Sequence, residues 1–313
     1  MLRYLLKRLL ATIPVMGVVA LFVFSLLYLS PGDPAAVIAG DIATEEDIAR
    51  IRAQLGLDQP YLVRFGGWLW ALAHGDLGTS IFTSLPVATL IGQRVEPTLA
   101  LTVCTMIVSV GLAVPLGVLA AARAGGWLDR AVMAVSVLGF SVPVFVIAYG
   151  LILLFSVQLE WLPVQGYRSF SDGFGPFIRH MILPSLALGI VYMALIARIT
   201  RATMLDVLAQ DYVRTATAKG LAPHTMLIRH ALKNAAVPIV TVIGIGVALL
   251  IGGVVVTETV FAIPGLGRLT VDAILRRDYP IIQGVTLLFS AVYVLVNLLV
   301  DLSYSLFDPR IRY

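Results

Sequence analysis

Six long apolar stretches constrain this chain more than any other feature of its sequence. A helix needs about 20 mostly apolar residues to cross roughly 30 Å of hydrocarbon. Because 59% of the residues are hydrophobic and only 13% are charged, the chain could not cover a soluble core with a polar surface. The sequence therefore predicts an all-α membrane protein with about six transmembrane helices. The six stretches are residues 9–29, 98–122, 131–157, 180–197, 237–256 and 281–306.

The first apolar stretch follows Arg3, Lys7 and Arg8, so it could be taken for a cleavable signal peptide. It is longer than the usual apolar region of about 7–15 residues in such peptides. The segment Pro31-Gly32-Asp33-Pro34 follows it, where a signal peptide would have small residues around a cleavage site. We therefore expect it to be retained as an N-terminal anchor helix.

The Lys and Arg residues are distributed unequally between the loops, and this predicts the orientation. With a cytoplasmic N-terminus, the inside segments hold 13 of the 22 basic residues in 68 positions, and the outside segments hold nine in 114. Both termini are then cytoplasmic. Since the basic residues lie between apolar segments, the net charge of +4 does not indicate nucleic-acid binding. The predicted organisation is an anchor helix over 1–30, a periplasmic segment over 31–97, a permeation core of five helices over 98–306 with a cytoplasmic loop at 205–234, and a cytoplasmic tail over 307–313.

The predicted periplasmic segment contains one clear helix signal and one aromatic cluster. Residues 45–55 form an expected helix, with Thr44 as its N-cap and Gly56 at its end. The following stretch, 61–70, is rich in aromatic residues, and we expect Trp68 and Trp70 to lie at the level of the lipid headgroups.

The predicted cytoplasmic loop is too polar to cross a bilayer. A helix over 212–219 should end at Gly220, which adopts the left-handed conformation easily, and Pro223 should begin a second helix over 224–232. Small residues on the first helix, Thr215, Ala216 and Ala218, would let a partner approach closely. From the residues alone, two interpretations stay open: a helix that docks into a partner's groove, and an amphipathic linker on the headgroups.

This loop resembles the EAA-type cytoplasmic loop of binding-protein-dependent ABC importers, in the variant of the dipeptide, oligopeptide, nickel and glutathione permeases. The generic Glu-Ala-Ala is replaced by Arg214-Thr215-Ala216, and the generic Leu-Pro by Leu232-Lys233, which favours this subfamily over sugar or amino-acid importers. The matching segments are Tyr212-Val213-Arg214-Thr215-Ala216, Ala218-Lys219-Gly220, Arg229-His230-Ala231-Leu232 and Asn234.

The resemblance extends over the whole chain. Weaker signatures of the same family are Pro31-Gly32-Asp33-Pro34, Leu55-Gly56-Leu57-Asp58-Gln59-Pro60, Gly75-Asp76-Leu77-Gly78, Pro264-Gly265-Leu266-Gly267-Arg268 and Asp308-Pro309-Arg310-Ile311-Arg312. It implies a type I importer permease fold in a bacterial inner membrane, with coupling residues Tyr212, Arg214, Thr215, Ala216, Lys219, Gly220, Leu221, Arg229 and His230.

The resemblance also implies the partners. These are a second permease subunit, two cytoplasmic ATPases that bind ATP and magnesium, and a periplasmic or lipid-anchored solute-binding protein. The chain itself has no Gly-x4-Gly-Lys-Ser/Thr loop, because Lys219-Gly220 has the reverse order, so we expect it not to hydrolyse ATP. Nor does it show a Cys/His metal cluster or a catalytic motif, and its single cysteine, Cys104, allows no internal disulfide.

Polar groups within apolar stretches suggest functional positions. Glu258, at the end of the fifth stretch, and Asn297, in the sixth, are possible pathway or gate residues, although a plain loop carboxylate and a hydrogen bond between helices are the simpler interpretations. Pro115 and Pro143 can kink their helices. The glycines of the fifth stretch predict close helix packing, and they are Gly244, Gly246, Gly252 and Gly253.

The expected function is the translocation subunit of an ATP-driven importer of di- or oligopeptides. The same class of importer for glutathione or nickel complexes is the alternative. An ion-coupled secondary transporter is the remote one, because Glu258 and Asp301 lie towards the ends of their spans and no inverted repeat is visible.

Overall fold

The computed structural model of the chain describes residues 2–29, 33–40, 43–54 and 56–307. These residues are helical apart from turns and loops, and the described ranges contain no strand, only an isolated bridge between Thr79 and Pro86. The predicted all-α class is therefore confirmed. The chain divides into two compact units, residues 1–94 with 269–291 and residues 95–268 with 292–313.

The first unit contains the N-terminal helices and parts of three others. Its complete helices are α1 (Leu2–Leu29), α2 (Pro34–Ala39), α3 (Glu45–Gln54) and α4 (Tyr61–Ala73). It shares α5 (Val87–Ala122), α14 (Leu266–Arg276) and α15 (Tyr279–Phe307) with the second unit.

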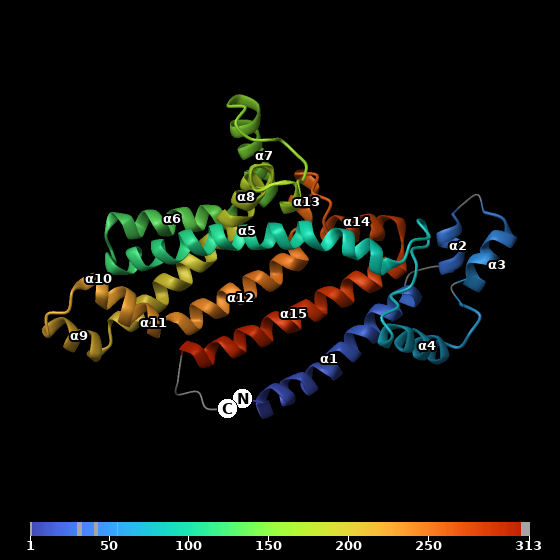
Figure 1. Ribbon diagram of the computed structural model, residues 1–313, viewed down its shortest axis with the longest axis horizontal. Helices are drawn as coiled ribbons and strands as arrows, with labels where there is room; N and C mark the ends of the chain where they lie inside the picture. Colours follow the sequence, from blue (N-terminus) through green and yellow to red (C-terminus); the bar gives the residue numbers. More distant parts are fainter. Residues whose placement is uncertain (1, 30–32, 41–42, 55, 308–313) are drawn as a thin grey trace. The chain divides into compact units, whose positions relative to one another are not determined.

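The second unit holds the remaining helices (Figure 1). Two of its segments, Ile152–Gln158 and Met226–Ala231, are π-helical, and Phe170–Asp172 is a 3₁₀ turn. Its α-helices are α6 (Trp127–Ser141), α7 (Val144–Leu151), α8 (Phe174–Leu208), α9 (Asp211–Ala218), α10 (Pro223–Thr225), α11 (Leu232–Asn234), α12 (Ala236–Gly253) and α13 (Val255–Val260).

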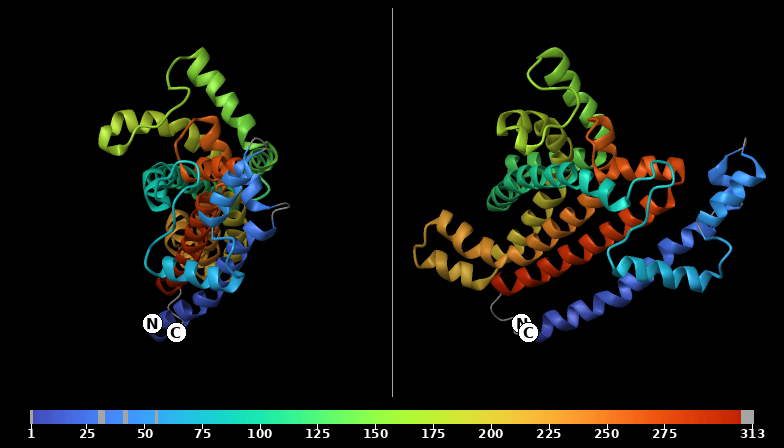
Figure 2. Two further views of the ribbon diagram at one scale, coloured as in Figure 1. Left: turned by 90° about the vertical axis from the view of Figure 1, so that its right-hand side faces the viewer. Right: turned by 45° about the vertical axis from the view of Figure 1, so that its right-hand side comes forward.

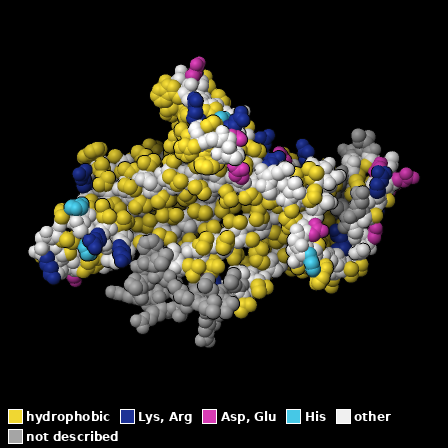
Figure 3. All heavy atoms as spheres, viewed as in Figure 1, with side chains coloured by type: hydrophobic (Ala, Val, Ile, Leu, Met, Phe, Trp, Pro, Cys, Tyr) yellow, Lys and Arg dark blue, Asp and Glu magenta, His cyan; other side chains and the backbone are white. Residues whose placement is uncertain are grey.

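The described residues hold four to six candidate membrane spans, in agreement with the six predicted. Four uninterrupted helices, α1, α5, α8 and α15, are long and apolar enough to cross a bilayer. Two more candidates are bent pairs: α6 with residues 144–158, and residues 223–234 with α12. Apolar side chains cover much of the surface along the long helices (Figure 3).

The third predicted span, 131–157, is a bent pair of helices, with a sharper break at Pro143 than the predicted kink. The chain bends by 103° between α6 and the helical stretch Val144–Gln158, which turns away from α6 in Figures 1 and 2. Val142 is extended, with φ −85° and ψ 127°, and so is Pro143, with φ −57° and ψ 138°. A proline restricts the residue before it to extended backbone and offers no N–H of its own, so Pro143 breaks the helix instead of kinking it.

Two other predicted helices proved longer than their apolar cores. α5 begins at Val87 instead of residue 98, and α8 covers Phe174–Leu208 instead of 180–197. Hydropathy detects only the part of a helix that suits hydrocarbon, whereas the helix itself continues into polar sequence. In contrast, α12 ends at Gly253, earlier than the predicted residue 256.

The predicted N-cap of α3 is confirmed. Thr44 Oγ1 accepts a hydrogen bond from the Asp47 N–H at 3.3 Å, and the Thr44 N–H donates to Asp47 Oδ2 at 3.2 Å, so the two residues cap each other. The Thr44 hydroxyl, which also donates to this carboxylate, lowers the pKa of Asp47. Gly56 has the expected positive φ of +62°, and Leu55 lies outside the described residues.

Aromatic side chains join α4 to α1 in the first unit. The ring of Phe24 lies 5.4 Å from that of Tyr61 and 5.2 Å from that of Trp68, centroid to centroid. The Arg64 guanidinium lies over the Phe24 ring at 5.5 Å. Trp70 is 70% exposed, which leaves it free for the predicted headgroup contact, whereas Trp68 packs on α1.

The core of the second unit forms around α8, which packs against α6, α7 and α12. A Cβ on Gly244 would lie 2.0 Å from Val300 Cγ2, and one on Gly246 would lie 3.1 Å from Met106 Cε. These two glycines of α12 therefore allow the close packing that the sequence predicted. The side-chain surroundings of Gly252 and Gly253 lie outside the description.

Candidate coupling site

The predicted helix-turn-helix is present, and its turn depends on Gly220. α9 ends in a Schellman arrangement, in which the Leu221 N–H donates to the Ala216 carbonyl at 3.2 Å and the Gly220 N–H to that of Thr217 at 2.9 Å. Gly220 has φ +79°, in the left-handed region, and a Cβ there would meet no atom within 4 Å. The position favours glycine for its left-handed backbone conformation and not for lack of space.

The second arm begins at Pro223, in the first turn of a helix, as the sequence predicted. It extends to Asn234, two residues beyond the predicted end, and its middle part, Met226–Ala231, is π-helical. We call residues 211–234 the coupling hairpin. In Figures 1 and 2 the hairpin projects from one end of the second unit.

The base of the coupling hairpin is packed firmly. Ala231 and Ala235 are fully buried and belong to one apolar cluster with Val118 of α5 and with Met204 and Val207 of α8. The two arms also bond to each other, because the Asn234 side-chain amide donates to the Tyr212 hydroxyl at 2.8 Å. A force on α9 therefore reaches two long helices through direct contacts.

The tip of the coupling hairpin is open. The Arg214 side chain is 82% exposed, and its 3.5 Å ion pair with Asp211 is solvated. Ala218 is exposed, as predicted, whereas Ala216 is only partly so. Basic side chains gather at this end of the second unit in Figure 3. Of the predicted coupling residues, Tyr212, Arg214, Thr215, Lys219, Gly220, Arg229 and His230 are exposed, and Ala216 and Leu221 are partly buried.

The two possible gate residues do not join this surface. Glu258 is 0% exposed, and its carboxylate accepts hydrogen bonds from Thr98 and from the backbone of Arg268. Asn297 donates to the carbonyl of Tyr293, one turn earlier in its own helix, at 3.0 Å. The side-chain nitrogen of Asn297 therefore bonds within its own helix and does not form the expected hydrogen bond between helices.

Sequence reasoning missed a partly buried ion pair near the coupling hairpin. Asp129 of α6 is 3% exposed, and Arg201 of α8 binds both of its carboxylate oxygens, with Nη2 at 2.6 Å from Oδ2 and a second contact from Nε. The Gly125 N–H also donates to Oδ2, at 2.9 Å. A lone carboxylate at the start of an apolar stretch was the available signal, but its partner lies 72 positions away.

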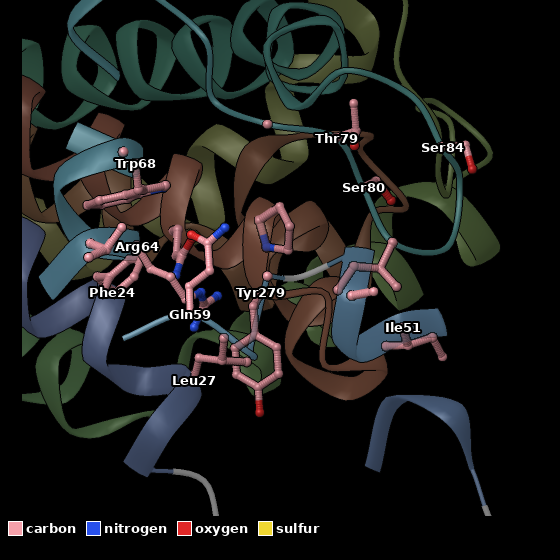
Figure 4. Close-up of a pocket in the computed structure, with 18 residues that line it drawn as sticks. Phe24, Leu27, Ile51, Gln59, Arg64, Trp68, Thr79, Ser80, Ser84 and Tyr279 are labelled. Carbon is pink, nitrogen blue, oxygen red and sulfur yellow. The ribbon is translucent and has the colours of Figure 1, made fainter. Parts of the chain in front are cut away.

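The first unit contains a cavity of about 680 Å³ that no sequence feature indicated. Figure 4 shows Phe24, Arg64 and Trp68 along one side of it, with Thr79 and Ser80 across from them. In the described ranges, no group of three His, Cys, Asp or Glu side chains is placed to hold a metal ion.

Two family models together match most of the chain. The first, described as a binding-protein-dependent transport system inner membrane component, matches residues 113–313. The second, the N-terminal part of the membrane component of such systems, matches residues 1–102.

Several named proteins are similar over nearly their full length. A probable peptide ABC transporter permease of Sinorhizobium fredii is 59% identical over 99% of each chain. A putative peptide transport system permease of Brucella abortus is 46% identical over 99% of this chain and 98% of its own. The glutathione transport system permease GsiC of Salmonella choleraesuis is 45% identical over the whole of both chains.

A solved structure shares the fold. A chain of the MetNI methionine ABC transporter, in an inward-facing conformation, aligns with a TM-score of 0.58 and 19% identity. The alignment covers 71% of this chain and 97% of that one.

Proposed function

This chain belongs to the family of inner-membrane components of binding-protein-dependent transport systems, and from that membership we propose that it carries peptides across the membrane. We also propose that Gly220 and its neighbours receive the movement of the partner ATPase. The family is one of multi-pass permeases and not of ATPases, with the fold of type I ABC importers. Membership implies an ATPase and a solute-binding protein as partners, and ATP and magnesium belong to the ATPase.

Peptides are the substrate that the relatives favour. The proteins at 59% and 46% identity are named as peptide permeases, and a glutathione permease follows at 45%. Glutathione, itself a small peptide-like solute, is therefore the second candidate, and nickel complexes are a third that rests on the sequence motifs alone. Uptake of a labelled dipeptide by the whole importer in proteoliposomes, competed by longer peptides, by glutathione and by nickel complexes, distinguishes them.

The observation that carries the coupling proposal is the contrast between the open tip and the packed base of the coupling hairpin. Exposed small and basic residues on α9 suit a helix that lies in a groove of the ATPase. Closure of the ATPase pair on ATP displaces α9, and the cluster around Ala231 and Ala235 transmits the displacement to α5 and α8. Because coupling between sites is reciprocal, docking of the solute-binding protein should stimulate ATP hydrolysis.

The proposed orientation has both termini and the coupling hairpin in the cytoplasm. The excess of Lys and Arg in those segments supports it. The chain forms half of the pathway and pairs with a second, homologous permease. Exposed apolar side chains on the stretch after the 103° bend, such as Phe145, Tyr149 and Leu153, give such a partner or lipid a surface to cover.

The coupling proposal is tested at Gly220 with two variants of different backbone preference. Gly220→Asn keeps access to the left-handed region, whereas Gly220→Val does not, and either side chain enters open space. In the reconstituted importer we expect Gly220→Val to lose ATP-dependent uptake by about tenfold or more while Gly220→Asn stays near wild type. Equal uptake by both variants, in complexes that assemble normally, would refute the role of this turn.

A further inference from the structure

Two features that the sequence analysis treated separately meet in the second unit. They are Glu258, at the end of the fifth apolar stretch, and the motif Pro264-Gly265-Leu266-Gly267-Arg268, which opens α14. Glu258 is one of the largest fully buried side chains of the described residues. A carboxylate in such surroundings must be compensated by hydrogen bonds or by opposite charge.

The hydrogen bonds around Glu258 are donated towards its carboxylate, either directly or through Thr98. The Leu266 N–H donates to Thr98 Oγ1 at 2.8 Å, and the Thr98 hydroxyl in turn donates to Glu258 Oε1 at 2.6 Å. The Arg268 N–H donates to Oε2 at 2.9 Å. Both oxygens of the carboxylate are acceptors, and the N-terminus of α14 contributes the positive end of its dipole.

Two glycines of the motif make room for this carboxylate. A Cβ on Gly265 would lie 2.0 Å from Glu258 Oε1, and a Cβ on Gly267 would lie 3.0 Å from Oε2. Both glycines have ordinary backbone angles, so they serve close approach and not a special turn. The motif therefore provides the space that the Glu258 carboxylate occupies.

A second carboxylate fastens a neighbouring loop to the same turn of α5. Glu96 accepts hydrogen bonds from the Tyr167 hydroxyl at 2.9 Å and from the Ser169 hydroxyl. The Gly166 N–H donates to the carbonyl of Phe261 at 2.8 Å. Burial, and then the nearby Glu96, raise the pKa of Tyr167, so its hydroxyl remains a donor. We call Glu96, Thr98 and Glu258, with the groups that bind them, the carboxylate clasp.

We infer that Glu258 is a positioning residue that fastens this end of α5 to the 261–268 connection, so that the clasp moves as one body and does not open as a gate during transport. Opening it would leave a buried carboxylate and two amides without partners, which is far costlier than displacing the clasp whole. The inference takes the transport activity from the proposed function, and it replaces the interpretation of Glu258 as a gate residue.

The contact between Glu258 and Gly265 is tested by suppression. We expect Gly265→Ala to lower the melting temperature of the purified importer and its uptake, because the added methyl meets Oε1. Glu258→Ala in the same chain should restore much of the melting temperature, because it removes the clash, but not the uptake, because it also removes the carboxylate, whereas Glu258→Gln, which fills the same space, should restore neither. Gly175→Ala is the matched control, because a Cβ there meets no atom within 4 Å. A double variant that is no better than Gly265→Ala would refute the contact.

The positioning role is tested at Thr98. Thr98→Val removes the hydroxyl that links Leu266 to Glu258, whereas Thr98→Ser keeps it. We expect the Thr98→Val importer to assemble and to retain basal ATP hydrolysis. Its maximal uptake should fall by about fivefold, which is the change in an equilibrium that the loss of one buried hydrogen bond produces, and Thr98→Ser should keep the wild-type uptake. Full uptake by Thr98→Val would overturn the inference.

The two proposals can fail separately. If the wild-type importer carries no peptide, the proposed function fails, but the melting temperatures of the Gly265→Ala and Glu258→Ala variants still decide whether the clasp exists. If peptide uptake is normal and Gly220→Val abolishes it while Thr98→Val has no effect, the proposed function stands and the inference fails.

Discussion

The coupling hairpin and the carboxylate clasp use polar residues in opposite ways. The hairpin exposes its charged and small side chains at a tip and packs alanines at its base. The clasp buries the carboxylate of Glu258 and satisfies it with the Thr98 hydroxyl and the Arg268 amide. An exposed polar surface is free to bind another protein, whereas a buried and fully bonded one holds its own chain together.

The largest expected effect comes from the partly buried ion pair of Asp129 and Arg201. Asp129→Asn or Arg201→Gln alone should destabilise the importer by about 2–3 kcal/mol, because each removes charge-assisted hydrogen bonds and leaves the other partner poorly compensated. The double variant should cost less than the sum of the two, since neither residue is then left alone. Thermal unfolding of the detergent-solubilised complex measures this. Additive losses would show that the pair does not act as a unit.

A smaller effect is expected where α5 and α8 meet above the coupling hairpin. A Cβ on Gly117 would lie 2.7 Å from Thr200 Cβ and 2.8 Å from the Ala197 carbonyl oxygen. Gly117→Ala should therefore separate the two helices, at a cost of about 1–3 kcal/mol, and reduce uptake. Gly111→Ala, in the same helix and with no atom within 4 Å of its Cβ, is the control. Equal melting temperatures for the two variants would contradict the close packing at the hairpin's base.

The hydrogen bond between the hairpin arms should matter less than either contact in the core. Tyr212→Phe and Asn234→Ala each remove the same 2.8 Å bond, so each should reduce uptake by about two- to fivefold, corresponding to roughly 1 kcal/mol or less. The combined variant should be no worse than either alone. Uptake measured at equal amounts of assembled complex would show whether the two residues act through this bond, and a combined loss larger than both would argue against it.

The smallest structural effect is expected at the exposed pair of Asp211 and Arg214. Because both side chains are solvated, Arg214→Gln should leave the melting temperature unchanged. We expect uptake to fall about twofold if the guanidinium contacts the ATPase, in line with a modest rim contact. A matching loss of stability would mean that Arg214 supports the hairpin and does not contact the partner.

Features set by neighbouring residues were predictable from the sequence. Gly220 and Pro223 determine the turn of the coupling hairpin through their own backbone preferences, and the structure has that turn where it was expected. Thr44 and Asp47 likewise identify the start of α3. The length of the apolar stretches was enough for the number of candidate spans.

Features that depend on distant contacts were not predictable in this way. The partner of Glu258, Thr98, lies 160 positions away, and nothing local distinguishes a seated carboxylate from one in a loop. The break at Pro143 could be suspected, but its 103° angle depends on how α7 packs against α8 and α13. The helix starts at Val87 and Phe174 are followed by polar and charged residues, Arg94 and Glu96 in α5 and Arg179 in α8, which weaken the hydropathy signal there.

The length of α8 has a mechanical consequence. Its 35 residues extend over about 52 Å at 1.5 Å per residue, well beyond the roughly 30 Å of hydrocarbon. One end follows the loop that Glu96 holds, and the other packs on the coupling hairpin. A rigid rod of this length that tilts by only about 5° about one end moves its other end by roughly 4–5 Å. Under the proposed coupling, a small tilt of α8 would therefore displace one of its ends by a distance comparable to the width of a solute's backbone.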